Sequence, residues 1–160
     1  MSEWIPHETK DYPKSYEDSV WNKDPEQEKY IIKETDTVVM MHDKFPACDG
    51  HLLFIPKYDQ PRYIAEAMAE AYQHGLDEKD KGNYDGFNVG MNISECAGQS
   101  VFWPHIHSIP RKDGDEERKH TGIRSCYPKD AYAPKPKEED YHVMQARLKK
   151  ERRAYIDKIR

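Results

Sequence analysis

Two histidines, His105 and His107, stand one residue apart in the run Gly98–Arg111 (GQSVFWPHIHSIPR). Side chains alternate across a strand, so a strand over Gln99–Ile109 places both imidazoles and Trp103 on one face. The roots of the imidazoles would then lie about 6.6 Å apart, since a strand rises about 3.3 Å per residue. Both rings can reach one phosphate group, where one attacks phosphorus and the other holds charge or a proton. The Gly-Gln-Ser turn before them offers N–H groups, an amide and a hydroxyl to phosphate oxygens.

Composition indicates one domain with polar ends. The chain has 160 residues, a net charge of −5 and a hydrophobic content of 36%, and its mean hydropathy is −1.08. This charge balance does not suggest general nucleic-acid binding. The three cysteines are widely spaced without a CxxC pair, which fits a reducing, cytoplasmic setting. No apolar run is long enough for a signal peptide or a membrane span.

The hydrophobic pattern predicts an α+β fold with an antiparallel sheet of about five strands, one main helix and a C-terminal helix. Strands are expected at residues 37–42, 51–57, 87–92 and 99–109, and the main helix at 63–76, followed by a charged loop at 77–82. Residues 1–34 form an acidic N-terminal extension whose aromatic residues, including Tyr16 and Trp21, argue for docking on the domain. The domain proper covers 35–134. Residues 135–160 form a helical extension with an apolar stripe over 141–159.

Three motifs in order resemble the histidine triad (HIT) superfamily of nucleotide hydrolases and transferases. That family ends its signature strand with His-x-His-x-His after a Gly-Gln-Ser/Thr turn, and the run GQSVFWPHIHSIPR matches it. HDKFPACDGHLLFIPK (residues 42–57) and FNVGMN (residues 87–92) match two further family segments. The resemblance continues weakly through GIRSCYPKDAYAP and spans roughly residues 35–134. It implies the family fold, in which two such domains pair into a homodimer.

The resemblance also implies the site. His105 matches the nucleophile that attacks the α-phosphorus and carries a nucleotidyl group. His107 matches the histidine that supports the charge of the phosphate, and His51 matches one that points into the same pocket. The remaining matches contact phosphate or the leaving group, or accept ribose hydroxyls in the case of the carboxylate: Asn92, Gln99, Ser100 and Asp43.

One position departs from the family pattern. Trp103 stands where the first histidine of the triad belongs, so we expect it to shape the pocket. Proline also precedes the nucleophile in the related galactose-1-phosphate uridylyltransferases, so Pro104 is compatible with catalysis. Their signature ends in glutamine where this chain keeps His107, which brings the chain nearer to the hydrolase branches.

The residues leave several alternatives open. Zinc suits imidazole, and a site of His51, His105 and His107 is conceivable, but the CxxC of zinc-binding relatives is absent and we expect neither metal nor cofactor. The predicted function is hydrolysis or transfer at the α-phosphate of a nucleotide derivative. The first alternative is a catalytically weak nucleotide-binding or regulatory protein, which the replacement by Trp103 would allow. The second is a nucleic-acid end-processing enzyme, if the basic C-terminal stretch binds DNA or RNA.

Overall fold

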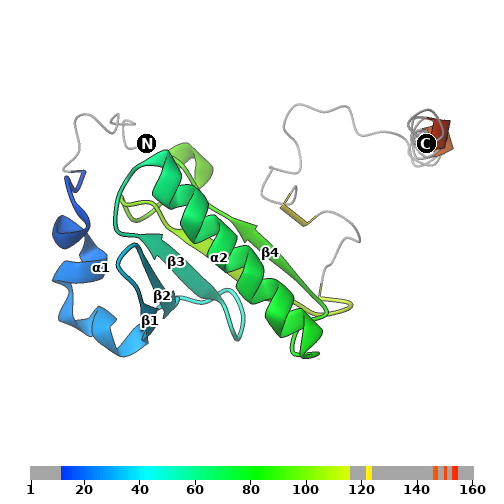
Figure 1. Ribbon diagram of the computed structural model, residues 1–160, viewed down its shortest axis with the longest axis horizontal. Coiled ribbons are helices and arrows are strands. Elements are labelled where there is room, and N and C mark those ends of the chain that lie inside the picture. The colour runs from blue at the N-terminus through cyan, green and yellow to red at the C-terminus, as the bar shows by residue number, and fades with distance from the viewer. Residues whose placement is uncertain (1–11, 116–121, 124–145, 148–149, 151–152, 155–160) are drawn as a thin grey trace. The chain divides into compact units, whose positions relative to one another are not determined.

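The computed structural model describes residues 12–115, 122–123, 146–147, 150 and 153–154 (Figure 1). The chain divides into two units, Met1–Ile123 and Arg124–Arg160. The apolar stripe of the predicted C-terminal helix lies outside the described residues. No helix in the described ranges is long and apolar enough to cross a membrane.

The first unit is built on one antiparallel sheet, which confirms the predicted α+β class. Its five strands lie in the order β1-β2-β3-β5-β4. Their bounds are Ile31–Glu34 for β1, Val38–His42 for β2, Leu52–Pro56 for β3, Gly86–Gly90 for β4 and Ile106–Arg111 for β5. The predicted number of about five strands is confirmed, but the sequence located only four, and the fifth is the short edge strand β1. Its pairing with β2 is interrupted by an irregularity between Ile31 and Lys33.

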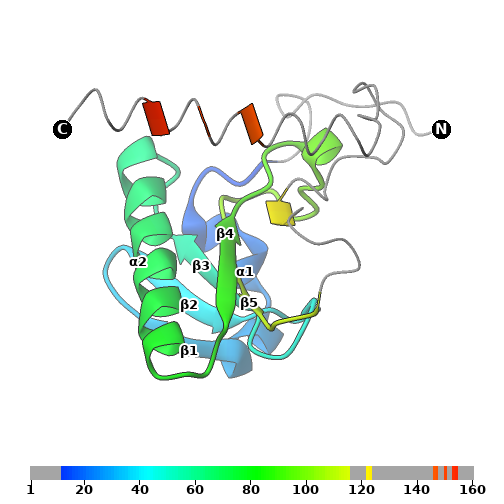
Figure 2. The same ribbon diagram turned by 90° about the vertical axis from the view of Figure 1, so that its right-hand side faces the viewer.

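Helix α2 (Pro61–Asp80) covers one face of the sheet and packs on β3, β4 and β5 (Figures 1 and 2). Alternate strand residues face it because side chains alternate across a strand. The buried cluster beneath the helix includes Phe54, Ile106, Ala67 and Ala71. The helix extends four residues beyond the predicted end at residue 76, into the segment expected as a charged loop.

The close approach of α2 to β4 depends on a glycine. A Cβ atom built on Gly75 would lie 2.4 Å from the ring of Phe87. Such a distance is far below ordinary contact, so any larger residue would push the helix off the strand. The absence of a side chain at Gly75 therefore allows α2 to lie close against the edge strand β4.

The N-terminal segment packs with residues of the opposite face of the sheet. Its described part, residues 12–30, contains three short helices, η2 (Tyr16–Asp18), α1 (Val20–Lys23) and η3 (Pro25–Tyr30). Tyr16 and Trp21 are buried in one cluster with Met41 and Leu53 of β2 and β3. The expected docking of the N-terminal aromatic residues is thereby confirmed for these two.

The strand expected over residues 99–109 is shorter and begins later. Residues 99–105 form a loop, and β5 starts at Ile106. Pro104 has no N–H to donate to a neighbouring strand, which explains why regular pairing starts only after it. His107 therefore lies on a strand, while His105 and Trp103 precede it, and their positions follow from loop geometry instead of strand alternation.

Candidate active site

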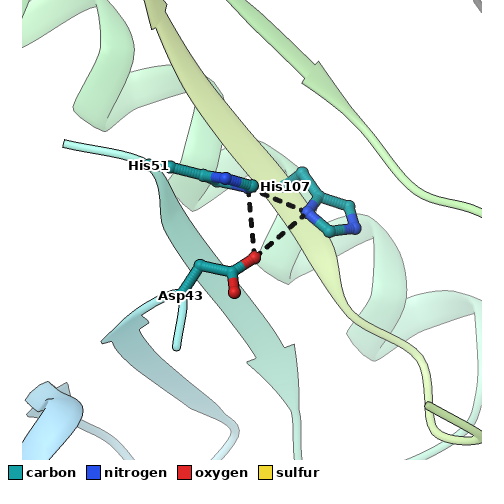
Figure 3. Close-up of side chains that lie close together, drawn as sticks. All are labelled: Asp43, His51 and His107. Atoms are coloured by element: carbon teal, nitrogen blue, oxygen red, sulfur yellow. Dashed lines mark hydrogen bonds and ion pairs between the residues drawn. The ribbon is translucent and has the colours of Figure 1, made fainter. Parts of the chain in front are cut away.

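Three polar side chains meet where β2, β3 and β5 run side by side (Figure 3). Asp43 directly follows β2 and His51 directly precedes β3, and the N–H of Asp43 donates to the carbonyl of His51. His107 on β5 lies opposite Leu53 of the neighbouring strand β3. The sheet thus brings together three of the residues predicted for the site.

The proton on His51 is fixed by the loop between β2 and β3. The backbone N–H of Ala47 donates to His51 Nδ1 over 3.0 Å. An acceptor Nδ1 carries no proton, so a neutral His51 holds its proton on Nε2. Burial lowers the pKa of His51, and Asp43 opposes this effect only in part, so the neutral ring is favoured near pH 7.

His107 accepts a hydrogen bond from the Nε2–H of His51. His51 Nε2 lies 2.9 Å from His107 Nδ1, and with the tautomer above it is the donor. Burial, together with the neighbouring His105 and His51, lowers the pKa of His107 to about 4. A neutral His107 that accepts at Nδ1 carries its own proton on Nε2. This buried Nε2 has no partner in the described part of the chain, so its capacity to donate a hydrogen bond is unmet there.

Asp43 adds negative charge beside both imidazoles. Its Oδ2 lies 3.5 Å from His51 Nε2 and 3.9 Å from His107 Nδ1. Its Oδ1 accepts the backbone N–H of Phe45, which holds the carboxylate in place. The predicted contact of Asp43 with ribose hydroxyls stays a prediction.

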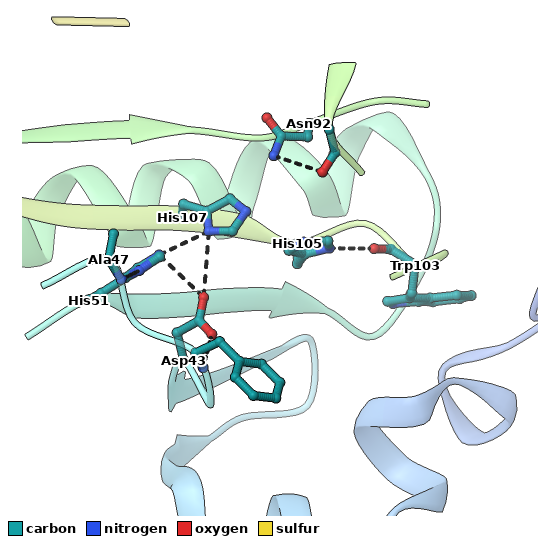
Figure 4. Close-up of polar contacts among 9 residues, drawn as sticks. Asp43, Ala47, His51, Asn92, Trp103, His105 and His107 are labelled. Carbon is teal, nitrogen blue, oxygen red and sulfur yellow. Dashed lines mark hydrogen bonds and ion pairs between the residues drawn. The ribbon is translucent and has the colours of Figure 1, made fainter. Parts of the chain in front are cut away.

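His105 is oriented by the loop that precedes β5 (Figure 4). Its Nδ1 lies 2.8 Å from the backbone oxygen of Trp103. A carbonyl only accepts, so Nδ1–H is the donor, and a neutral His105 keeps a lone pair on Nε2. Burial lowers the pKa of His105, so this lone pair is present at neutral pH. The ring packs against His107 and Trp21, with centroids 5.0 Å and 5.5 Å away.

Trp103 lies in the core, only 2% exposed. Its indole N–H donates to the carbonyl of Pro56 over 2.8 Å, and the ring belongs to the cluster that contains Tyr16 and Trp21. What it offers His105 directly is its backbone oxygen. Its side chain contributes packing, and a pocket-shaping role remains a prediction.

The turn before His105 is organised by its own side chains. Gln99 is buried; its Oε1 accepts the N–H of Ser94 and its Nε2 donates to the carbonyl of Val101. Ser100 is exposed. Asn92 Nδ2 donates to the carbonyl of Gly98 over 3.5 Å, and Gly98 has a φ of +88° that favours glycine. The amide of Gln99 thus supports the loop, and the predicted phosphate contacts of these residues remain predictions.

The site also depends on groups that the sequence motifs did not single out. These are the N–H of Ala47 and the indole of Trp21, which touch His51 and His105 respectively. A backbone N–H leaves no mark on residue type, and Trp21 lies outside the motif region. Together the residues place a neutral imidazole with a lone pair on Nε2 at His105 next to a hydrogen-bond donor at His107.

Asp43, His51 and His107 also have the composition of a metal site. The ligand atoms are 2.9, 3.5 and 3.9 Å apart, near the roughly 3.3 Å that tetrahedral zinc bonds of about 2.05 Å require. The proton arrangement does not fit. Zinc needs a lone pair on His51 Nε2, whereas the N–H of Ala47 holds the proton there. Metal binding would therefore require loss of that hydrogen bond.

The lowered pKa of His107 predicts acid-sensitive folding. Its usual pKa is 6.5 and its pKa in the folded protein is about 4, so between these values the unfolded chain binds the proton more readily. Stability should therefore fall as the pH drops from 6.5 toward 4, by about 2 kcal/mol between pH 7 and pH 5 from this group. Urea unfolding of wild type and of His107→Gln at both values measures it.

Between pH 7 and pH 5, His107→Gln should lose less folding stability than the wild-type protein. His42→Gln is the matched control, because His42 is exposed on β2, and it should keep the wild-type loss. Equal acid sensitivity of His107→Gln and wild type would contradict the assignment.

Comparison with known proteins places this geometry in context. The family model described as HIT domain matches residues 24–114. An uncharacterised HIT-like protein of Saccharolobus solfataricus is 32% identical over 95 residues, which cover 55% of this chain and 68% of the relative. The adenylylsulfatase HINT3 of Arabidopsis thaliana is 34% identical over 92 residues, covering 52% of this chain and 46% of that protein.

Solved structures agree with the fold. A zinc-bound histidine triad family protein from Mycobacterium smegmatis superimposes with a TM-score of 0.50 at 30% identity, covering 54% of this chain and 68% of that one. A Hit-like protein from Bartonella henselae gives a TM-score of 0.54 at 24% identity, covering 62% and 80%. The second likeness concerns the fold alone.

Proposed function

Because this chain belongs to the HIT domain family, we propose that it is a nucleotide hydrolase or nucleotidyltransferase that forms a covalent nucleotidyl-histidine intermediate on His105. Family membership supports a function of the nucleotide hydrolase or transferase type in general. One observation carries the finer proposal. The hydrogen bond from His105 Nδ1–H to the oxygen of Trp103 leaves a lone pair on Nε2 of a buried, neutral ring.

In the first step, His105 Nε2 attacks the α-phosphorus. The N–P bond forms as the bond to the leaving group breaks, and the leaving group departs with that electron pair. An amine leaving group takes up a proton from solvent water as it departs, and the second step returns one proton to solvent. The imidazole becomes a cation that bears phosphorus on Nε2 and a proton on Nδ1. The carbonyl of Trp103 stabilises this cation, since a hydrogen bond from a charged donor is stronger than one from a neutral donor.

In the second step, water replaces His105 on phosphorus. The oxygen of water forms the new bond, and the electron pair of the N–P bond returns to Nε2. One proton of water stays on the product and the other is released to solvent, so His105 is again neutral. Another acceptor in place of water makes the same step a transfer. Dividing one displacement into two lets the acceptor enter after the leaving group has gone.

His107 and His51 support the charge on phosphate during both steps. The unpaired Nε2–H of His107 donates to a phosphate oxygen. His51 keeps that proton on Nε2 by occupying Nδ1 of His107 with its own N–H. Phosphoryl chemistry of this kind depends mainly on placement and charge stabilisation.

The remaining predicted contacts complete the proposal. Asp43 accepts ribose hydroxyls, and Asn92, Gln99 and Ser100 surround the phosphate or leaving group. We also propose that the protein forms a homodimer, as in the family. We further propose a reducing, cytoplasmic compartment, which is consistent with Cys48 and Cys96 being free thiols. Sedimentation of the purified protein measures the oligomeric state.

The decisive experiment is to look for the intermediate. Wild-type protein is mixed with adenosine 5′-phosphosulfate, a dinucleoside polyphosphate or a nucleoside phosphoramidate and quenched within milliseconds to seconds. Intact mass spectrometry should show a mass increase of one nucleotidyl group, and peptide mapping should assign it to His105. Product release without any adduct would contradict the covalent mechanism.

A nucleotide-binding protein without appreciable turnover is the second candidate, because Trp103 replaces the first histidine of the triad. The same mixtures distinguish it. Saturable binding of a nucleoside monophosphate with neither adduct nor product would favour this regulatory function and overturn the enzymatic one.

We predict that the reaction needs no metal. The N–H of Ala47 keeps a proton on the nitrogen of His51 that a metal would need, and the phosphate contacts come from imidazoles and the turn. Turnover should be unchanged after dialysis against EDTA, and one equivalent of zinc should not increase it. Loss of turnover on chelation, with recovery on adding zinc or magnesium, would show a metal-dependent site.

A further inference from the structure

A cavity lies beside the site but outside the imidazole cluster. Its volume is about 310 Å³, at the lower end of the range for small-molecule sites. Pro104, the residue before His105, forms part of its wall, as do Asn92 and Gln99. None of the four residues Asp43, His51, His105 and His107 is among its described lining residues.

The cavity combines apolar walls with one carboxylate. Ile64, Met91 and Ile93 supply apolar surface. Of the described residues that line it, Asp59 alone carries a formal charge. The hydroxyl of Tyr12 donates to Asp59 Oδ2 over 3.3 Å. Burial, followed by the charge of Asp59, raises the pKa of Tyr12 to about 12, so the hydroxyl remains a donor at neutral pH.

The cavity lies on the Asn92 side of the imidazoles, away from Asp43. In Figure 4 the imidazoles of His105 and His107 lie between Asp43 and Asn92. The proposed ribose contact is at Asp43. A phosphate held between the imidazoles therefore directs its other substituent toward Asn92 and the cavity that Asn92 lines.

We propose that this cavity, the Tyr12–Asp59 pocket, binds the leaving group, and that it favours leaving groups with an apolar stem that ends in a primary ammonium group. The inference rests on the proposed function and narrows its substrate class. Apolar walls receive the stem, and the carboxylate, which only accepts hydrogen bonds, receives the ammonium. Polyphosphate and sulfate leaving groups are disfavoured, since Asp59 repels them. Phosphoramidates of diamines combine a P–N bond with the required cation.

Direct binding tests the pocket without turnover. The full chain, labelled with ¹⁵N, is titrated with n-pentylammonium chloride and separately with 1-pentanol. We expect saturable shifts at the amides of Ile64 and Ile93, and tighter binding of the ammonium by about two- to fivefold, because Asp59 is exposed and its ion pair is screened. Asp59→Asn should remove this difference. Asp80→Asn, an exposed carboxylate at the end of α2, should preserve it.

Turnover tests the link to the reaction. Two adenosine 5′-phosphoramidates are compared, one of 1,5-diaminopentane and one of n-hexylamine, which replaces the distal ammonium by a methyl group. Wild type should prefer the first in kcat/KM by a similar factor. Asp59→Asn should abolish the preference, and Asp59→Lys should reverse it.

The outcomes separate the two proposals. Saturable amine binding that depends on Asp59, with no turnover of any nucleotide, would show an amine-binding pocket but overturn both the enzymatic function and the assignment of the pocket to a leaving group. Equal turnover of both phosphoramidates, with shifts that do not depend on Asp59, would support the function and overturn this inference. Equal binding of 1-pentanol and n-pentylammonium would also overturn it.

Discussion

Replacing His105 by alanine should abolish the covalent adduct and reduce kcat by at least about 10⁴-fold, the scale seen when a nucleophile is removed from an enzyme. The reason is that the lone pair on His105 Nε2 forms the bond to phosphorus, and no other described residue presents an oriented imidazole in its place. His107 donates at Nε2 and accepts at Nδ1, so its neutral ring has no free lone pair. Rapid-quench kinetics and intact mass spectrometry on the same samples measure both effects.

The control is His42→Ala. His42 is exposed at the end of β2, outside the imidazole cluster, and this variant should retain adduct and turnover. Binding of a nucleoside monophosphate to His105→Ala should change little, because Asp43 and His107 remain in place. An adduct trapped on another residue, or a His105→Ala protein that retains turnover, would contradict the assignment of the nucleophile.

The sequence predicted those parts of the fold that are governed by local periodicity. The runs that became β2 and β3 are almost continuously apolar, and residues 63–76 show helical spacing that became the middle of α2. The sequence does not locate strand β1, because four residues of which one is half-buried and three are exposed carry little pattern. The strand predicted over residues 99–109 begins too early, because Pro104 has no N–H to donate and regular pairing starts only at Ile106.

The site was predictable as a set of residues but not as a proton arrangement. Motif order identified His51, His105 and His107. Which nitrogen of each ring bears the proton depends on the N–H of Ala47 and the oxygen of Trp103, two backbone groups that only the folded loops bring into reach. The predicted strand over residues 99–109 places Trp103 on the same face as both imidazoles, whereas in the structure the loop turns its indole into the core.

Trp103→Ala should lower the free energy of unfolding by about 3–5 kcal/mol, the usual cost of removing a large aromatic side chain from a core. The indole is almost fully buried among Tyr16, Trp21 and Leu53, and its N–H satisfies the carbonyl of Pro56. Urea unfolding at pH 7 measures the loss. Phe45→Ala is the matched control, since Phe45 is 83% exposed, and should change stability by no more than about 0.5 kcal/mol.

A second substitution, Trp103→Phe, separates the role of the indole from that of the backbone oxygen of residue 103. Its backbone oxygen holds His105 Nδ1–H whatever the side chain is, so the folded fraction of Trp103→Phe should still form the adduct. Trp103→Phe keeps most of the volume but removes the hydrogen bond to the carbonyl of Pro56, which should cost about 1–3 kcal/mol. Loss of adduct in Trp103→Phe without loss of stability would mean that the indole itself acts in the reaction. Unchanged stability of Trp103→Ala would contradict its place in the core. If both expectations hold, the missing histidine has been replaced by a core residue, and the part of this position that serves catalysis is a carbonyl that every amino acid supplies.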